Sequence, residues 1–170
     1  MRRPGKHLPH HYLKPGGVFI AQEPTVVTTL LGSCVAVTMF HPRRRIGAIC
    51  HGLLPSCREG DAGQCDRNCV FSFKFMDCSI RRMLEKFKAV GITPREMEIK
   101  LFGGADMFGV PETDDRRMTI GRQNVTITRQ ILDDERLPVL VEDVGGERGR
   151  KIFFYTHTGE ILLKRLSNRP

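Results

Sequence analysis

Short apolar runs separated by turn residues dominate the first third of the chain. The runs are rich in valine, isoleucine and leucine, and Pro24 and the tripeptide Gly32-Ser33-Cys34 interrupt them. Runs of this length and composition, bounded by proline and glycine, favour β-strands over helices. The pattern predicts strands at residues 18–20, 26–30, 35–40 and 46–54.

Two later segments have the periodicity of helices. Between Phe73 and Val90 apolar residues recur three and four positions apart, which places them on one helix face, and Gly91 can end that helix. The pattern predicts a second helix over residues 120–133. Its inward side chains would be three isoleucines: Ile120, Ile127 and Ile131.

The rest of the chain is again rich in strands. They are predicted at residues 97–102, 139–144, 152–155 and 161–166, and Thr158-Gly159 can form the turn before the last one. Because strands outnumber helices and short turns join most of them, we predict an α+β fold, a layered sandwich of mainly antiparallel β-sheets with outer helices. A chain of 170 residues closes one core, so we expect a single domain over residues 15–170.

Charge separates a short N-terminal segment from that domain. The net charge is +8, and residues 1–14 hold four basic side chains and no acidic one, which predicts a disordered basic tail. The sequence has no basic helix pattern and no tryptophan, so it does not favour nucleic acid as a partner. No apolar run suits an export signal or membrane insertion. We therefore expect a cytoplasmic protein whose six cysteines stay reduced.

Cys34 and His51 come together if the two central strands form a hairpin. A four-residue loop at residues 41–44 would pair Phe40 with Arg45, and the same register would set Cys34 directly opposite His51. Directly opposed residues have Cβ atoms about 4.5–5.5 Å apart, close enough for a thiol to meet an imidazole. A slip of one residue would send the two side chains to opposite faces.

A cysteine beside a histidine can pass its proton to the ring and attack a carbonyl carbon as a thiolate. Backbone N–H groups of Ser33 and Cys34, in a turn that Gly32 permits, could form an oxyanion hole. A hydroxyl or carbonyl group on the neighbouring strand could orient the ring, and Thr28 and Thr29 both lie there. Alternation places only one of them on each face, and the pattern leaves the choice open.

Catalysis has a simpler competitor, because a cysteine in a strand is usually a small apolar filler of the core. Cys50 illustrates this: it neighbours His51 but should point to the opposite face of the same strand.

Several motifs agree in order and spacing with one known family. Leu31-Gly32-Ser33-Cys34-Val35-Ala36-Val37 is followed by His51, seventeen residues after the cysteine, and by Leu54-Pro55. Further motifs within residues 12–166 are Pro15-Gly16, Glu23-Pro24-Thr25, Phe102-Gly103-Gly104-Ala105, Ile120-Gly121 with Asn124, and Glu142-Asp143-Val144-Gly145-Gly146. In these motifs the chain resembles the CheD family, the chemoreceptor glutamine deamidases of bacterial chemotaxis. Collinear agreement of this kind is far more specific than any single motif.

The resemblance implies a Cys-His-Thr triad in which Cys34 is the nucleophile, His51 the base and acid, and Thr28, six residues before the cysteine, orients the histidine. It implies a fold similar to the catalytic domain of cytotoxic necrotizing factor toxins. The implied reaction is hydrolysis of glutamine side chains to glutamate through a thioester, with no metal or organic cofactor. Implied partners are the cytoplasmic domains of methyl-accepting chemotaxis receptors and CheC, and hydrolysis of glutamyl methyl esters would be a side reaction.

Residues 56–78 depart from the family pattern and carry four cysteines: Cys57, Cys65, Cys69 and Cys78. Four cysteines could bind zinc and make the chain a metal-stabilised interaction module, although their spacings do not match paired C-x₂-C knuckles. Reduced thiols in a surface loop are the simpler interpretation. A cysteine peptidase that uses the same triad is the remaining alternative.

Overall fold

The computed structural model describes residues 7–54, 75–107 and 118–167. Its first sheet contains, in spatial order, β1 (His10–Tyr12), β3 (Val26–Leu31), β8 (Arg150–Tyr155) and β9 (Ile161–Arg165). Its second sheet contains, in spatial order, β2 (Val18–Ile20), β5 (Ile46–Gly52), β4 (Val35–His41), β6 (Glu98–Gly103) and β7 (Val139–Val144). The helices are α1 (Met76–Ala89), the short 3₁₀ helix η2 (Pro94–Glu96) and α2 (Ile120–Asp134).

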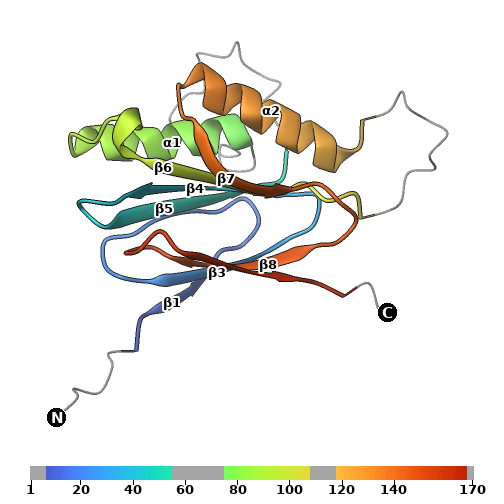
Figure 1. Cartoon of the computed structure of the whole chain (residues 1–170), viewed down its shortest axis with the longest axis horizontal. Helices are drawn as coiled ribbons and strands as arrows, with labels where there is room; N and C mark the ends of the chain where they lie inside the picture. The colour runs from blue at the N-terminus through green and yellow to red at the C-terminus, as the bar shows by residue number, and fades with distance from the viewer. Residues whose placement is uncertain (1–6, 55–74, 108–117, 168–170) are drawn as a thin grey trace.

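The elements stack in three layers. Helices α1 and α2 cover one face of the five-stranded sheet, and the four-stranded sheet lies against its other face (Figure 1). Only the pairs β1–β3 and β6–β7 are parallel among the described strands, and the other pairs are antiparallel. This confirms an α+β fold with two layered sheets and outer helices. The likeness to the cytotoxic necrotizing factor domain stays a prediction.

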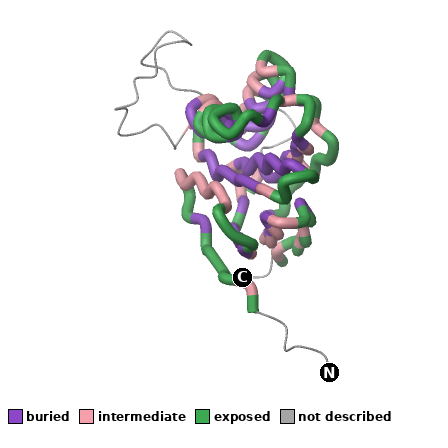
Figure 2. The backbone as a smooth tube through the Cα atoms, turned by 90° about the vertical axis from the view of Figure 1, so that its left-hand side faces the viewer, coloured by how far each residue is buried: buried purple, intermediate pink, exposed green. Residues whose placement is uncertain are grey.

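Two apolar layers fill the spaces between these elements. The helix-side layer lies between the helices and the five-stranded sheet and includes Val37, Cys50 and Leu84. The inter-sheet layer lies between the two sheets and includes Ala36 and Ile49. Residues adjacent in β4 and β5 thus enter different layers, as strand alternation requires. Figure 2 shows the buried stretches of both layers running through the middle of the molecule.

Strand β1 falls in the segment that the charge pattern set apart as a basic tail. It lies within residues 1–14, and it pairs in parallel with β3 so that Tyr12 is the partner of Thr28. Leu13, which follows, is only 3% exposed and belongs to the inter-sheet layer. Because a three-residue strand has almost no hydrophobic pattern of its own, the basic composition of this segment hid it.

The inward face of α2 agrees with the prediction at Ile131, which packs against the helix-side layer, and differs from it at Ile120. Ile120 is 56% exposed, whereas the side chains of Asn124, Thr128 and Leu132 are buried. The cause is the close approach of Gly121 to the turn after β6. A Cβ atom at Gly121 would lie 2.6–2.8 Å from backbone atoms of that turn, so only this helix rotation lets the two backbones meet.

Candidate active site

The register of the central hairpin differs from the predicted one by two residues. Ala36, and not Cys34, lies opposite His51, because His41 continues β4 and pairs with Ile46. The hairpin loop therefore begins one residue later than predicted. A shift of two residues preserves the faces, so the two side chains still belong to the same side of the sheet.

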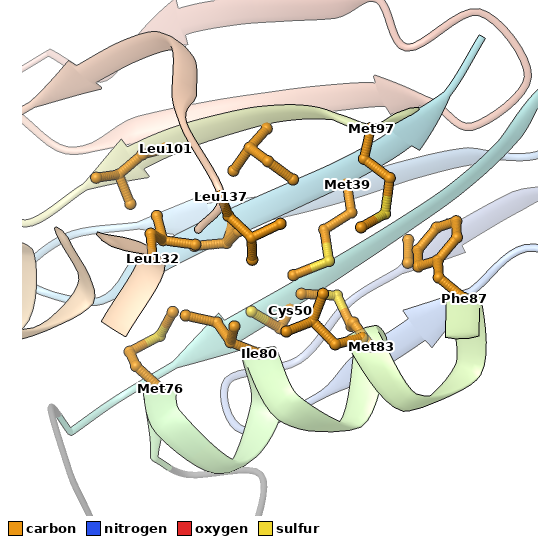
Figure 3. Packing of buried hydrophobic residues seen from close by; sticks show 14 of the residues in the cluster. Met39, Cys50, Met76, Ile80, Met83, Phe87, Met97, Leu101, Leu132 and Leu137 are labelled. Carbon is orange, nitrogen blue, oxygen red and sulfur yellow. The ribbon is translucent and has the colours of Figure 1, made fainter. Parts of the chain in front are cut away.

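Both predicted catalytic side chains face the inter-sheet layer. Cys34 immediately precedes β4, is half-buried and packs against this layer. His51 is only 1% exposed. Cys50 points the other way, as predicted, and Figure 3 shows its side chain in the helix-side layer, near Ile80 and Met83 of α1. The two layers thus separate one half-buried cysteine from one that is fully buried.

Thr29 holds the imidazole of His51. Its Oγ1 lies 2.7 Å from Nδ1 of His51 and donates its own proton to the carbonyl oxygen of Leu13, also at 2.7 Å. A hydroxyl has one proton, and a carbonyl can only accept, so Oγ1 must accept from the ring. Nδ1 therefore carries the hydrogen, and in the neutral ring Nε2 carries the lone pair. This is the tautomer that a general base needs.

Thr28, which the resemblance assigned to this role, makes a different contact. Its Oγ1 lies 2.6 Å from Nε2 of His10 on β1. Alternation along β3 turns Thr29 toward the inter-sheet layer with Val27 and Leu31, and turns Thr28 to the other face. The hydrogen bonds therefore place Thr29, and not Thr28, beside His51.

The segment after β1 fixes the backbone of His51 as well as its ring. The N–H of Gly16 donates to the carbonyl oxygen of His51 at 2.8 Å, and the N–H of His51 donates to the carbonyl oxygen of Gly17 at 3.0 Å. This N-terminal segment thus contacts the histidine backbone at two points, and through Leu13 it also anchors the Thr29 hydroxyl that holds the ring. It is a part of the site that sequence reasoning missed.

Burial favours the neutral forms of both candidate catalytic groups. Burial lowers the pKa of His51 to about 4, so its ring is uncharged at neutral pH. Burial also raises the pKa of the Cys34 thiol, and the backbone N–H of the same residue lowers it by less. Nε2 of His51 is buried, and no hydrogen-bond partner for it lies in the part of the chain that the structure describes. The arrangement is thus a thiol and a free base, and not a preformed thiolate–imidazolium pair.

Three consecutive carbonyl groups fix the turn that carries Cys34. The carbonyl oxygens of Gly32 and Cys34 accept from the N–H groups of Ala105 and Gly104, at 2.9 and 2.8 Å. The carbonyl oxygen between them, that of Ser33, accepts from Nδ2 of Asn124 at 2.9 Å. These hydrogen bonds brace the turn with the two segments that carry the Phe102-Gly103-Gly104-Ala105 motif and the Ile120-Gly121 motif with Asn124.

Comparison with known proteins gives consistent results. The family model described as CheD chemotactic sensory transduction matches residues 53–165. A protein of Geobacter sulfurreducens, named probable chemoreceptor glutamine deamidase CheD 2, is 54% identical over 94% of this chain and 92% of its own length. A probable chemoreceptor glutamine deamidase CheD of Maridesulfovibrio salexigens is 35% identical over 91% of both chains. The chain belongs to the CheD family.

The family match covers the segments that brace the turn carrying Cys34. It begins two residues after His51 and includes Gly104, Asn124 and Arg150. The alignment with the Geobacter relative is longer: at most ten residues of this chain fall outside it, so the segment from Thr28 to His51 lies within it. Likeness to the CheD family therefore extends over both halves of the candidate site.

Arg150, like the segment after β1, is a part of the site that the sequence pattern did not indicate. The residue is 1% exposed, and its guanidinium donates to Oδ1 of Asp143 at 2.7 Å and to the carbonyl oxygens of Gly103 and Gly145. Burial raises the pKa of Asp143, but the hydrogen bond and charge of Arg150 and the nearby Arg165 outweigh it and keep that pKa below its usual value. Arg150 thus ties β8 to the turn that contacts Cys34.

The zinc alternative concerns mainly residues outside the described ranges, where Cys57, Cys65 and Cys69 lie. Cys78 is described and is 7% exposed on α1. Within residues 7–54, 75–107 and 118–167, no group of three or more histidine, cysteine or acidic side chains could hold a metal ion. No helix in these ranges is long and apolar enough to cross a membrane.

Proposed function

We propose that this CheD protein hydrolyses glutamine side chains of chemotaxis receptors to glutamate. The names of the curated relatives, chemoreceptor glutamine deamidases, support this substrate. The observation that carries the chemistry is the chain of contacts from Leu13 through Thr29 to Nδ1 of His51, because it leaves Nε2 unprotonated in the layer that Cys34 enters. The proposed catalytic residues are Cys34, His51 and Thr29.

The reaction proceeds in two half-reactions. Nε2 of His51 accepts the thiol proton while Sγ of Cys34 attacks the amide carbon, and the imidazolium then donates that proton to the departing ammonia. Water attacks the resulting thioester with His51 again as base, which releases glutamate and restores the thiol. The N–H groups of Ser33 and Cys34 stabilise the oxyanion of each tetrahedral intermediate. No metal or organic cofactor takes part in these steps.

The proposal requires Sγ of Cys34 to approach Nε2 of His51 when substrate binds. Among the described residues, Nε2 has no hydrogen-bond partner. Catalytic hydrogen bonds are often long in the absence of substrate and shorten in the reactive complex. Buried neutral groups suit this order of events, since charge develops only when the amide is in place to use it.

The test is incubation of the purified protein with the cytoplasmic fragment of a chemoreceptor. Ammonia should be released, and the intact mass of the fragment should rise by about one dalton per glutamine converted. An unchanged mass with full-length folded enzyme would refute the proposal. Cleavage of the fragment into smaller bands would instead support the peptidase alternative, and stoichiometric zinc in protein purified without chelator would support the interaction module.

Action on receptor cytoplasmic domains places the protein in the cytoplasm, where thiols stay reduced. CheC as a further partner stays a prediction from the family resemblance. The methylesterase side reaction can be followed in the same assay, because hydrolysis of a glutamyl methyl ester removes about 14 daltons and releases methanol instead of ammonia.

A further inference from the structure

We infer that Asn124 is a positioning residue that joins the nucleophile turn to the strand of the catalytic histidine. This inference rests on the proposed function. The Asn124 side chain on α2 is fully buried, and its Nδ2 donates to the carbonyl oxygen of Ser33 at 2.9 Å and to that of Leu53 at 3.1 Å. Ser33 precedes Cys34, and Leu53 lies two residues after His51.

The place of this bridge in the sheet gives it its role. The ladder between β4 and β5 ends with the pair Val35 and Gly52, and the next pair would be Cys34 with Leu53. The amide of Asn124 lies where the two strands separate, and it holds together the segments that no longer pair. Because Cys34 is just beyond the last pair, its position relative to His51 depends on this contact as well as on the ladder.

The orientation of the amide follows from its partners. Both are carbonyl oxygens, which only accept, so the NH₂ group must face them and Oδ1 must point away. Oδ1 is buried and has no hydrogen-bond partner within residues 7–54, 75–107 and 118–167. An unsatisfied buried acceptor destabilises a fold, so this asparagine is a poor choice for stability alone. The two hydrogen bonds that its NH₂ group donates explain why an asparagine with an unsatisfied Oδ1 stands at this buried position.

The approach of α2 that brings Asn124 into place depends on two glycines. A Cβ atom at Gly104 would lie 2.3 Å from Val125 Cγ2, and one at Gly121 would lie 2.6 Å from the carbonyl oxygen of Ala105. The helix therefore reaches the nucleophile turn closely enough for a short asparagine side chain to span it.

The test compares two variants with a matched control. Asn124→Asp keeps the shape but cannot donate when ionised, and Asn124→Ala removes the amide together with its unsatisfied oxygen. The control is Thr128→Val, one turn further along the same buried face, whose Oγ1 donates only to the carbonyl oxygen of Asn124 within the helix. We expect both Asn124 variants to lose about 10- to 100-fold in kcat with KM within about twofold, while the control keeps its kcat.

A second measurement does not depend on the receptor substrate. The rate of Cys34 alkylation by iodoacetamide is followed against pH, with each variant kept below its own melting temperature. Iodoacetamide carries a primary amide, as the glutamine side chain does, so its entry can bring the thiol to His51 in the way that the substrate amide does. If Asn124 positions the thiol for this proton transfer, both variants should react about tenfold more slowly than the parent at neutral pH and converge with it at high pH, where the thiolate forms unaided. Equal alkylation profiles and equal kcat for parent and folded variants would overturn the inference. A parent that alkylates as described but leaves receptor glutamines unchanged would refute the proposed function alone.

Discussion

The two apolar layers of this protein differ in the polar groups that they contain. The helix-side layer is built mainly from aliphatic, aromatic and sulfur-containing side chains, among them Cys50, and the buried polar side chains of Asn124 and Thr128 lie on α2 beside it. The inter-sheet layer also receives the buried side chains of Thr29 and His51, and Arg150 is buried near its edge. The same five-stranded sheet therefore has one face packed mainly with apolar side chains and one face that holds the proposed catalytic residues.

The comparison shows how a buried polar group can be tolerated and still react. Nearly every polar atom of Thr29 and Arg150 is used in a hydrogen bond, which offsets the free energy of burial. His51 uses Nδ1 in the same way but leaves Nε2 without a partner. In the helix-side layer Cys50 has a pKa raised to about 12 by burial, so its thiol is inert at neutral pH. Partial exposure of Cys34, and not cysteine chemistry as such, distinguishes the two thiols.

The strongest test of the comparison is replacement of Cys34. We expect Cys34→Ala to lose at least about 10⁴-fold in receptor deamidation, because the covalent intermediate cannot form. Initial rates of ammonia release, measured on protein whose circular dichroism spectrum matches the parent, check this. Retention of substantial turnover by the folded variant would show that the nucleophile lies elsewhere.

Replacing the two threonines tests which of them belongs to the site. Thr29→Val keeps the shape but removes the acceptor that fixes the His51 tautomer, so kcat should fall about 10- to 100-fold. Thr28→Val removes only a contact with His10 on the other face of β3 and should leave kcat within about threefold of the parent. The reverse order of effects would return the orienting role to Thr28.

The dependence of stability on pH tests the burial of His51. Because its pKa is about 4 in the folded state and about 6.5 in the unfolded chain, the unfolded chain binds the extra proton between these values. Stability should therefore be highest above pH 6.5 and fall as the pH drops toward 4, by up to about 3 kcal/mol from this residue. Urea unfolding from pH 7 to 4 measures the slope, and His51→Gln should flatten it. An equal slope in parent and variant would mean that the ring titrates normally.

Sequence reasoning predicted the layers better than the contacts within them. Alternation fixed the faces of Cys34, His51 and Cys50, because a two-residue error in register does not change a face. The strand pattern could not decide whether Thr28 or Thr29 faces His51, because that choice depends on how the two sheets pack and not on any single strand. The carbonyl group of Leu13 and the amide of Asn124 act at long range, and a local pattern cannot indicate such contacts.

The smallest expected effect concerns Cys50. Its thiol is fully buried in the helix-side layer and lies on the opposite face of β5 from the reactive ring. Cys50→Ala removes a small apolar group and leaves a small cavity, so we expect a loss of about 1–2 kcal/mol in the free energy of unfolding. Deamidation per folded molecule should be unchanged, because no polar contact of the site passes through this thiol. A fall in kcat beyond about threefold at a temperature where the variant is folded would show that the two layers are coupled, and that the helix-side layer does more than stabilise the fold.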